Sequence, residues 1–131
     1  MLIFNVDDDC DDREFFSDAI KVVDPSIPCI LFENGQQLLY HLETTGILPN
    51  YIFIDINMPK MNGYECAQEV KSHYLTGEIQ IVMYSTAFNP ADKAKFEQQG
   101  FKYIVKQNSL GELVQSIKVV MSKGVILYDL I

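Results

Sequence analysis

The chain begins with an apolar run that leads directly into a cluster of carboxylates. Residues 2–6 are mainly apolar, and residues 7–12 read Asp-Asp-Asp-Cys-Asp-Asp. Carboxylates this close repel one another and raise each other's pKa unless a positive group lies between them. A hard divalent cation such as Mg2+, which takes oxygen ligands from one or two carboxylates, would relieve that repulsion. Asp is equally favoured at the start of a helix, so this segment alone leaves both interpretations open.

Short apolar runs alternate with segments of helical periodicity five times along the chain. Residues 51–54 are apolar at every position, as expected of a strand that is buried on both faces. Ser109, with Glu112 three residues later, forms the pattern of a capping box at the start of the last helix. Alternation with short loops predicts parallel strands joined by right-handed crossovers, in an open α/β sandwich. The predicted strands are 2–6, 27–32, 51–54, 79–84 and 103–105, and the predicted helices are 11–23, 35–44, 64–72, 90–99 and 109–122.

Polar side chains follow four of these five predicted strands. In open α/β sheets, ligands bind at the carboxyl ends of the strands, so these groups are predicted to meet at one edge. An Asp at a strand end is usually a turn or cap residue and a Lys there is usually solvated, but their coincidence at four strand ends indicates a site. The groups are Asp7 and Asp8 after the first strand, Asp55 after the third, Ser85 after the fourth and Lys106 after the fifth.

The carboxylates of this set fit phosphoryl transfer. Asp55, at the end of a buried strand, is a nucleophile that can accept a phosphoryl group as an acyl phosphate. Mg2+ held by Asp8, Asp55 and the backbone carbonyl of Asn57 would neutralise the charge on the phosphoryl oxygens. Asp7 would orient metal-bound water without being a ligand itself.

Two further groups would bind the phosphoryl oxygens. The Lys106 ammonium would pair with one oxygen, and the Ser85 hydroxyl would donate a hydrogen bond to another. The hydroxyl position is ambiguous by one residue because Thr86 follows directly, although counting along the strand favours Ser85.

The remaining acids of the N-terminal cluster are assigned to the start of the first helix, namely Asp9, Asp11 and Asp12. A calcium-binding EF-hand loop is excluded because Asp12 occupies the place of the glycine that such a loop requires.

The motifs together resemble the receiver domain of two-component response regulators, the group that includes the chemotaxis regulator. The resemblance covers essentially the whole chain and implies a flavodoxin-like doubly wound (βα)5 sandwich with parallel strands in the order 2-1-3-4-5. It also implies Mg2+ as cofactor and phosphorylation of Asp55 by a histidine kinase or a phosphotransfer protein. The residues that carry it are Val6-Asp7-Asp8, Asp55-x-x-Met58-Pro59-x-Met61-x-Gly63, Ser85-Thr86 and Lys106.

The same resemblance implies a switch on the fifth strand and exposes one departure from the family. Tyr103 matches the aromatic switch residue, whose ring turns inward as the hydroxyl residue, here Ser85, moves toward the phosphate. The family usually has a cis proline after the lysine, whereas Lys106 is followed by Gln107. A cis bond before a non-proline residue costs about 2.5–4 kcal/mol, so we predict a trans bond and a differently shaped loop.

From this resemblance we expect residues 1–123 to form a receiver domain that acts as a phosphorylation-activated signalling switch. It is not expected to be an enzyme beyond self-phosphorylation and self-dephosphorylation. Phosphorylation would alter the face formed by helix four, strand five and helix five, which would bind a downstream protein or a second copy of the chain. Residues 124–131 form a short apolar tail, and no output domain is expected.

Composition excludes several other classes of function. The net charge of −8 argues against nucleic-acid binding, which requires clustered Lys and Arg. No apolar run approaches the roughly 18 residues that span a bilayer, and the N-terminus lacks the basic region of a signal peptide. We therefore expect a cytoplasmic protein without membrane or nucleic-acid partners.

Three alternatives start from the same residues. A degenerate receiver could serve as a phosphorylation-independent interaction module, although no acceptor, metal-ligand or lysine position is missing. A phosphatase of the haloacid-dehalogenase type needs a general-acid Asp where Asn57 stands, and a cap domain for which the chain lacks length. A flavin-binding flavodoxin needs a backbone N–H cradle for phosphate, whereas the first loop here is rich in carboxylates.

Overall fold

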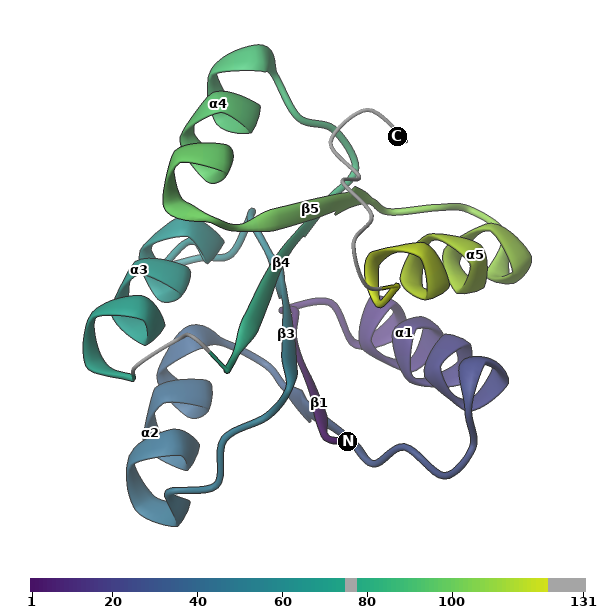
Figure 1. Cartoon of the computed structure of the whole chain (residues 1–131), viewed down its shortest axis with the longest axis horizontal. Coiled ribbons are helices and arrows are strands. Elements are labelled where there is room, and N and C mark those ends of the chain that lie inside the picture. Colours follow the sequence, from purple (N-terminus) through teal and green to yellow (C-terminus); the bar gives the residue numbers. More distant parts are fainter. Residues whose placement is uncertain (75–77, 123–131) are drawn as a thin grey trace.

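Five parallel strands form a central sheet in the order β2-β1-β3-β4-β5, with helices on both faces (Figure 1). The computed structural model describes residues 1–74 and 78–122. Helices α1 and α5 cover one face, and α2, α3 and α4 cover the other, which confirms the predicted fold class and strand order. The elements are β1 Ile3–Val6, α1 Cys10–Val23, β2 Cys29–Phe32, α2 Gly35–Thr45, β3 Tyr51–Asp55, α3 Gly63–His73, β4 Gln80–Ser85, α4 Pro90–Gln99, β5 Lys102–Val105 and α5 Leu110–Val120.

All ten predicted elements are present, with ends that differ by a few residues. Strand β2 begins at Cys29 rather than at residue 27, and Pro28, which has no N–H, contributes only its carbonyl, as an acceptor for Ile3. Ser109 caps α5 as predicted, since its hydroxyl accepts a hydrogen bond from the Glu112 N–H at 3.2 Å. The tail 124–131 and the domain boundary at residue 123 lie outside the described residues.

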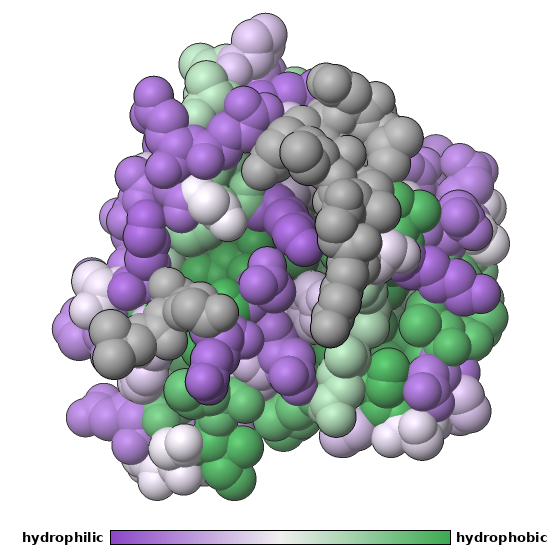
Figure 2. Space-filling model, viewed as in Figure 1, coloured by the Kyte–Doolittle hydropathy of each residue, from purple (hydrophilic) through white to green (hydrophobic). Residues whose placement is uncertain are grey.

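The two faces of the sheet carry separate hydrophobic cores. On the α1 and α5 side, Phe16 packs against Phe53 and Tyr84, with ring centroids 4.9 and 5.9 Å apart. On the other side α4 is weakly anchored, because Phe96 is its only buried residue. Hydrophilic side chains accordingly cover the upper left of the molecule, around α4 (Figure 2). Among the described residues, no helix is long and apolar enough to cross a membrane.

A close backbone approach fixes the loop between β3 and α3. The N–H of Gly63, the first residue of α3, donates to the Ile56 carbonyl at 2.9 Å. A Cβ at residue 63 would lie 2.7 Å from the Cα of Ile56 and would overlap the carbonyl oxygen of Asp55. Glycine is therefore required where α3 starts against the end of β3, which accounts for the last residue of the motif that begins at Asp55.

We expect Gly63→Ala to destabilise the protein by about 2 kcal/mol or more, because the methyl group meets backbone atoms that cannot rotate away. Gly111→Ala is the matched control, since a Cβ there meets nothing within 4 Å, and it should stabilise α5 by about 0.5 kcal/mol. Urea unfolding measures both changes, and equal stability of the two variants would contradict the close approach.

Candidate functional site

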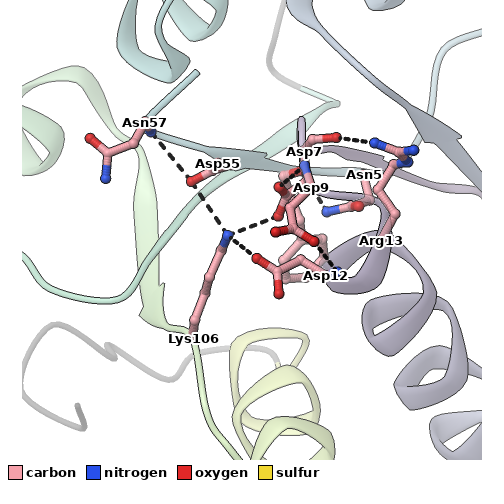
Figure 3. A network of polar contacts seen from close by, with 9 residues as sticks. Asn5, Asp7, Asp9, Asp12, Arg13, Asp55, Asn57 and Lys106 are labelled. Atoms are coloured by element: carbon pink, nitrogen blue, oxygen red, sulfur yellow. Dashed lines mark hydrogen bonds and ion pairs between the residues drawn. The ribbon is translucent and has the colours of Figure 1, made fainter. Parts of the chain in front are cut away.

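The carboxyl ends of β1, β3 and β5 bring three aspartates and a lysine together. Figure 3 shows two of these aspartates, Asp7 and Asp55, beside Lys106. Asp7, Asp8 and Asp55 each offer a carboxylate oxygen, and these oxygens lie within 4.8 Å of one another. Asp7 and Asp55 are buried, with 0% and 5% of their surface exposed, whereas Asp8 is open to solvent. The cluster therefore has two carboxylates inside the protein and one at the rim, through which an ion or substrate can enter.

Lys106 is the cation of this site. Its Nζ lies 2.9 Å from Asp7 Oδ2, 2.9 Å from Asp12 Oδ2 and 3.5 Å from Asp55 Oδ1 (Figure 3). The side chain is only 13% exposed, and its ammonium lies 5.2 Å from the centre of the Tyr84 ring. The lysine at the end of β5 is thus held against carboxylates from β1, α1 and β3.

Burial and like charge control the protonation of the carboxylates. Burial and, after it, the negative charge of Asp7 raise the pKa of Asp55 to about 7, although Lys106 acts in the opposite direction. Burial likewise raises the pKa of Asp7, more than its bonds to Lys106 and the Asp9 N–H lower it. Burial alone would lower the pKa of Lys106, but the bonds to Asp7 and Asp12 outweigh it and raise that pKa.

Backbone groups hold the two buried carboxylates in place. The Asn57 N–H donates to Asp55 Oδ1 at 3.3 Å, and the Asp9 N–H donates to Asp7 Oδ1 at 3.0 Å. Arg13 Nη1 donates to the backbone carbonyl of Asp7 at 2.8 Å, which ties α1 to the end of β1. Each carboxylate is thus oriented by the loop that directly follows its own strand.

The hydroxyl and aromatic candidates lie on the adjoining strands. Ser85 is the last residue of β4 and is 2% exposed, whereas Thr86 lies beyond the strand and is exposed. The Ser85 carbonyl accepts a hydrogen bond from the Lys106 N–H at 2.7 Å, which links the two strand ends. Tyr103 on β5 is 1% exposed, and its hydroxyl donates to Glu97 Oε1 at 3.3 Å. Its ring packs against Phe88, with centroids 5.2 Å apart.

Sequence reasoning missed two neighbours of Lys106. Asp12 was assigned only to the start of α1; it does lie in the first turn, with Asp9 as the cap, but it also forms an ion pair with Lys106. Tyr84 was treated only as part of a strand. The only sequence signal for the role of Asp12 was that the acidic run is longer than a metal site needs.

The bond between Lys106 and Gln107 is trans, as predicted, since the described residues contain no cis peptide.

Fold and site together define a doubly wound α/β protein with an acidic, lysine-bearing site at the carboxyl edge of its sheet. The family model of the response regulator receiver domain matches residues 3–118. The chain therefore belongs to the response regulator receiver family, the phosphorylation-activated switches of two-component signalling. Membership of this family gives no support to the alternative functions of a phosphatase or a flavodoxin.

Relatives and solved structures agree with this assignment. The sensory transduction protein LytT of Oceanobacillus iheyensis is 36% identical over 80 residues, which make up 61% of this chain and 31% of LytT. The response regulator Rcp1 of Synechocystis sp. is 25% identical over 123 residues, 89% of this chain and 84% of Rcp1. The chain thus spans less than a third of LytT but most of Rcp1.

Two similar crystal structures carry a metal or a phosphoryl modification. The Mn2+-bound form of Rcp1 superimposes with a TM-score of 0.78 at 25% identity, covering 95% of this chain and 96% of that one. The phosphorylated cyanobacterial phytochrome response regulator RcpA superimposes with a TM-score of 0.79 at 26% identity, covering 91% and 89% of the two chains.

In the metal-free protein, we expect the Asp55 carboxyl to titrate near pH 7. Asp7→Asn should lower this pKa, because it removes the adjacent negative charge and leaves Lys106 closer to Asp55. Carbon-detected NMR of the carboxyl groups measures the titration, and Asp18→Asn, at an exposed position of α1, is the control. An Asp55 pKa near its ordinary value, or one unchanged by Asp7→Asn, would contradict the described electrostatics.

Proposed function

We propose that Asp55 is the phosphoacceptor through which this receiver domain is switched. The observation that carries the proposal is the geometry at Asp55: a carboxylate at the end of a buried strand, 3.5 Å from the Lys106 ammonium and grouped with two further carboxylates. A bond would form between Asp55 and phosphorus as the bond between phosphorus and the leaving group breaks, and the leaving group keeps the electron pair. The phosphoryl donor would be a histidine kinase or a phosphotransfer protein.

The acidic cluster fits a hard divalent cation such as Mg2+. All of its donors are oxygens. Burial and the negative charge of Asp7 raise the pKa of Asp55, and a bound cation would offset that repulsion. We assign Asp8, Asp55 and the backbone carbonyl of Asn57 as ligands, with Asp7 orienting metal-bound water. When bound, Mg2+ would neutralise charge on the transferring phosphoryl group. The Mn2+-bound form of Rcp1 supports a divalent cation in a protein of this fold.

Lys106 and Ser85 complete the proposed phosphoryl site. The ammonium already faces Asp55 and would pair with one phosphoryl oxygen as a point charge. Ser85 ends β4 beside Lys106, joined to it by a backbone hydrogen bond, and its hydroxyl would donate to another oxygen. The burial of Ser85 and the exposure of Thr86 favour Ser85 in this role.

The signal would leave through the face formed by α4, β5 and α5. Helix α4 is held by a single buried side chain, and the Tyr103 hydroxyl on β5 bonds to Glu97 of that helix. Movement of Ser85 toward the phosphate would therefore be transmitted through Tyr103 to α4. The occupant of this face would be a downstream protein or a second copy of the chain.

A degenerate receiver that works without phosphorylation is the main alternative function. It requires that some part of the phosphoryl site be missing or misplaced. The carboxylates, the lysine and the buried hydroxyl are all present at the same edge of the sheet, which supports the phosphoacceptor instead.

Incubation with Mg2+ and phosphoramidate is expected to add one phosphoryl group to the wild-type protein and none to Asp55→Asn. The adduct should be stable in acid and labile in base, as an acyl phosphate is. Intact-mass spectrometry measures the addition, and peptide mapping locates it. Equal labelling of Asp55→Asn, or an unmodified wild type, would reject Asp55 as the acceptor.

Removal of the rim carboxylate tests the metal assignment separately. Asp8→Asn should weaken Mg2+ binding by at least tenfold, since loss of a metal ligand costs at least as much as loss of the partners that orient ligands. Labelling of this variant should then require correspondingly more Mg2+. Asp18→Asn is the control. If labelling of Asp8→Asn depends on Mg2+ in the same way as labelling of the wild type, Asp8 is not a metal ligand.

A further inference from the structure

Lys106 pairs with three carboxylates, and one of them, Asp12, has no part in the proposed metal site. Asp12, from the first turn of α1, pairs with the ammonium at 2.9 Å, the same distance as Asp7, whereas Asp55 lies at 3.5 Å. In the resting protein, the lysine therefore lies nearer to Asp12 than to the carboxylate whose phosphoryl group it would bind (Figure 3).

The backbone of Asp12 is fixed at the start of α1. Its N–H donates to Asp9 Oδ1 at 3.1 Å, within the cap of a 14-residue helix, and this places the side chain beside Lys106. The Tyr84 ring, 5.2 Å from Lys106 Nζ, bounds the ammonium on another side. The ammonium thus lies among three carboxylates and one aromatic ring. A small shift of the Lys106 side chain would change which carboxylate it pairs with most closely.

We propose that Asp12 is a positioning residue that acts through Lys106. In the resting protein, Asp12 holds the ammonium nearer to itself than to Asp55, and it releases the ammonium when Asp55 carries a phosphoryl group. This inference rests on the proposed function of Asp55. A phosphoryl group carries up to two negative charges and is therefore a stronger counter-ion than a carboxylate. The Asp12 side chain is 43% exposed, so water can solvate it once Lys106 leaves.

Asp12 therefore opposes phosphorylation in two ways. It competes with the incoming phosphoryl group for Lys106, and its own charge repels an anionic donor. Both effects act in the same direction, so loss of the Asp12 charge should make Asp55 more reactive rather than less.

Asp12→Asn keeps an oxygen near Lys106 but removes the charge. At saturating Mg2+, the second-order rate constant for labelling by phosphoramidate should rise roughly three- to fivefold, the upper range for a partly exposed ion pair. Asp11→Asn is the matched control, because it removes the same charge from the same turn at an exposed position. Its rate should stay within about twofold of the wild type.

Two further measurements separate positioning from simple charge removal. In a Lys106→Met background, Asp12→Asn should accelerate labelling no more than Asp11→Asn does. Calorimetric titration with Mg2+ in the absence of any donor should show weaker binding in Asp12→Asn than in Asp11→Asn, because the released ammonium shifts toward Asp7 and Asp55.

The results distinguish this inference from the proposed function. Equal labelling rates and equal Mg2+ affinities in Asp12→Asn and Asp11→Asn would overturn the role of Asp12, while labelling of Asp55 in the wild type would leave the proposed function standing. A wild type that is not labelled at Asp55 would reject the proposed function, and the Mg2+ affinities would then decide alone whether Asp12 positions Lys106.

Discussion

Two carboxylates buried at the ends of adjacent parallel strands are the constraint on which the rest of the site depends. Asp7 and Asp55 each place a carboxylate oxygen within 4.8 Å of the other's, and both residues are almost without exposure to solvent. Removing such groups from water disfavours their charged forms, and their proximity disfavours having both ionised. A cation is therefore required, and the end of β5 supplies Lys106, while the open side at Asp8 leaves room for a second. The loop hydrogen bonds, the glycine contact and the first turn of α1 all serve to hold these charges in one arrangement.

Much of the fold could be predicted because its determinants are local or periodic. Alternating apolar runs and helical segments located all ten elements, and the rule for open α/β sheets placed the polar strand ends at one edge. Strand order came from the family resemblance rather than from periodicity. The start of β2 was misplaced by two residues because the pattern of apolar residues cannot tell a strand from the extended segment before it.

The parts of the site that escaped prediction depend on side-chain direction across elements far apart in the sequence. Asp12 and Lys106 are 94 residues apart, and nothing in either local sequence indicates that one ammonium is shared between β1, β3 and α1. The contact between Tyr84 and Lys106 could not be predicted either, since an aromatic residue in a strand gives the same sequence pattern whether or not its ring lies beside a charged group. For the hydroxyl position, counting residues favoured Ser85, and the burial of Ser85 beside the exposure of Thr86 supports that proposal.

Tyr84 and Tyr103 belong to the cores on opposite faces of the sheet, one beside Lys106 and the other bonded to α4. The chain contains seven tyrosines and no tryptophan, so no indole masks their ultraviolet signals. Two of the seven tyrosine chromophores are therefore placed to sense change, Tyr84 beside the charge at the site and Tyr103 bonded to the helix proposed to transmit the signal. The near-ultraviolet spectrum of the protein can report both events without any attached label.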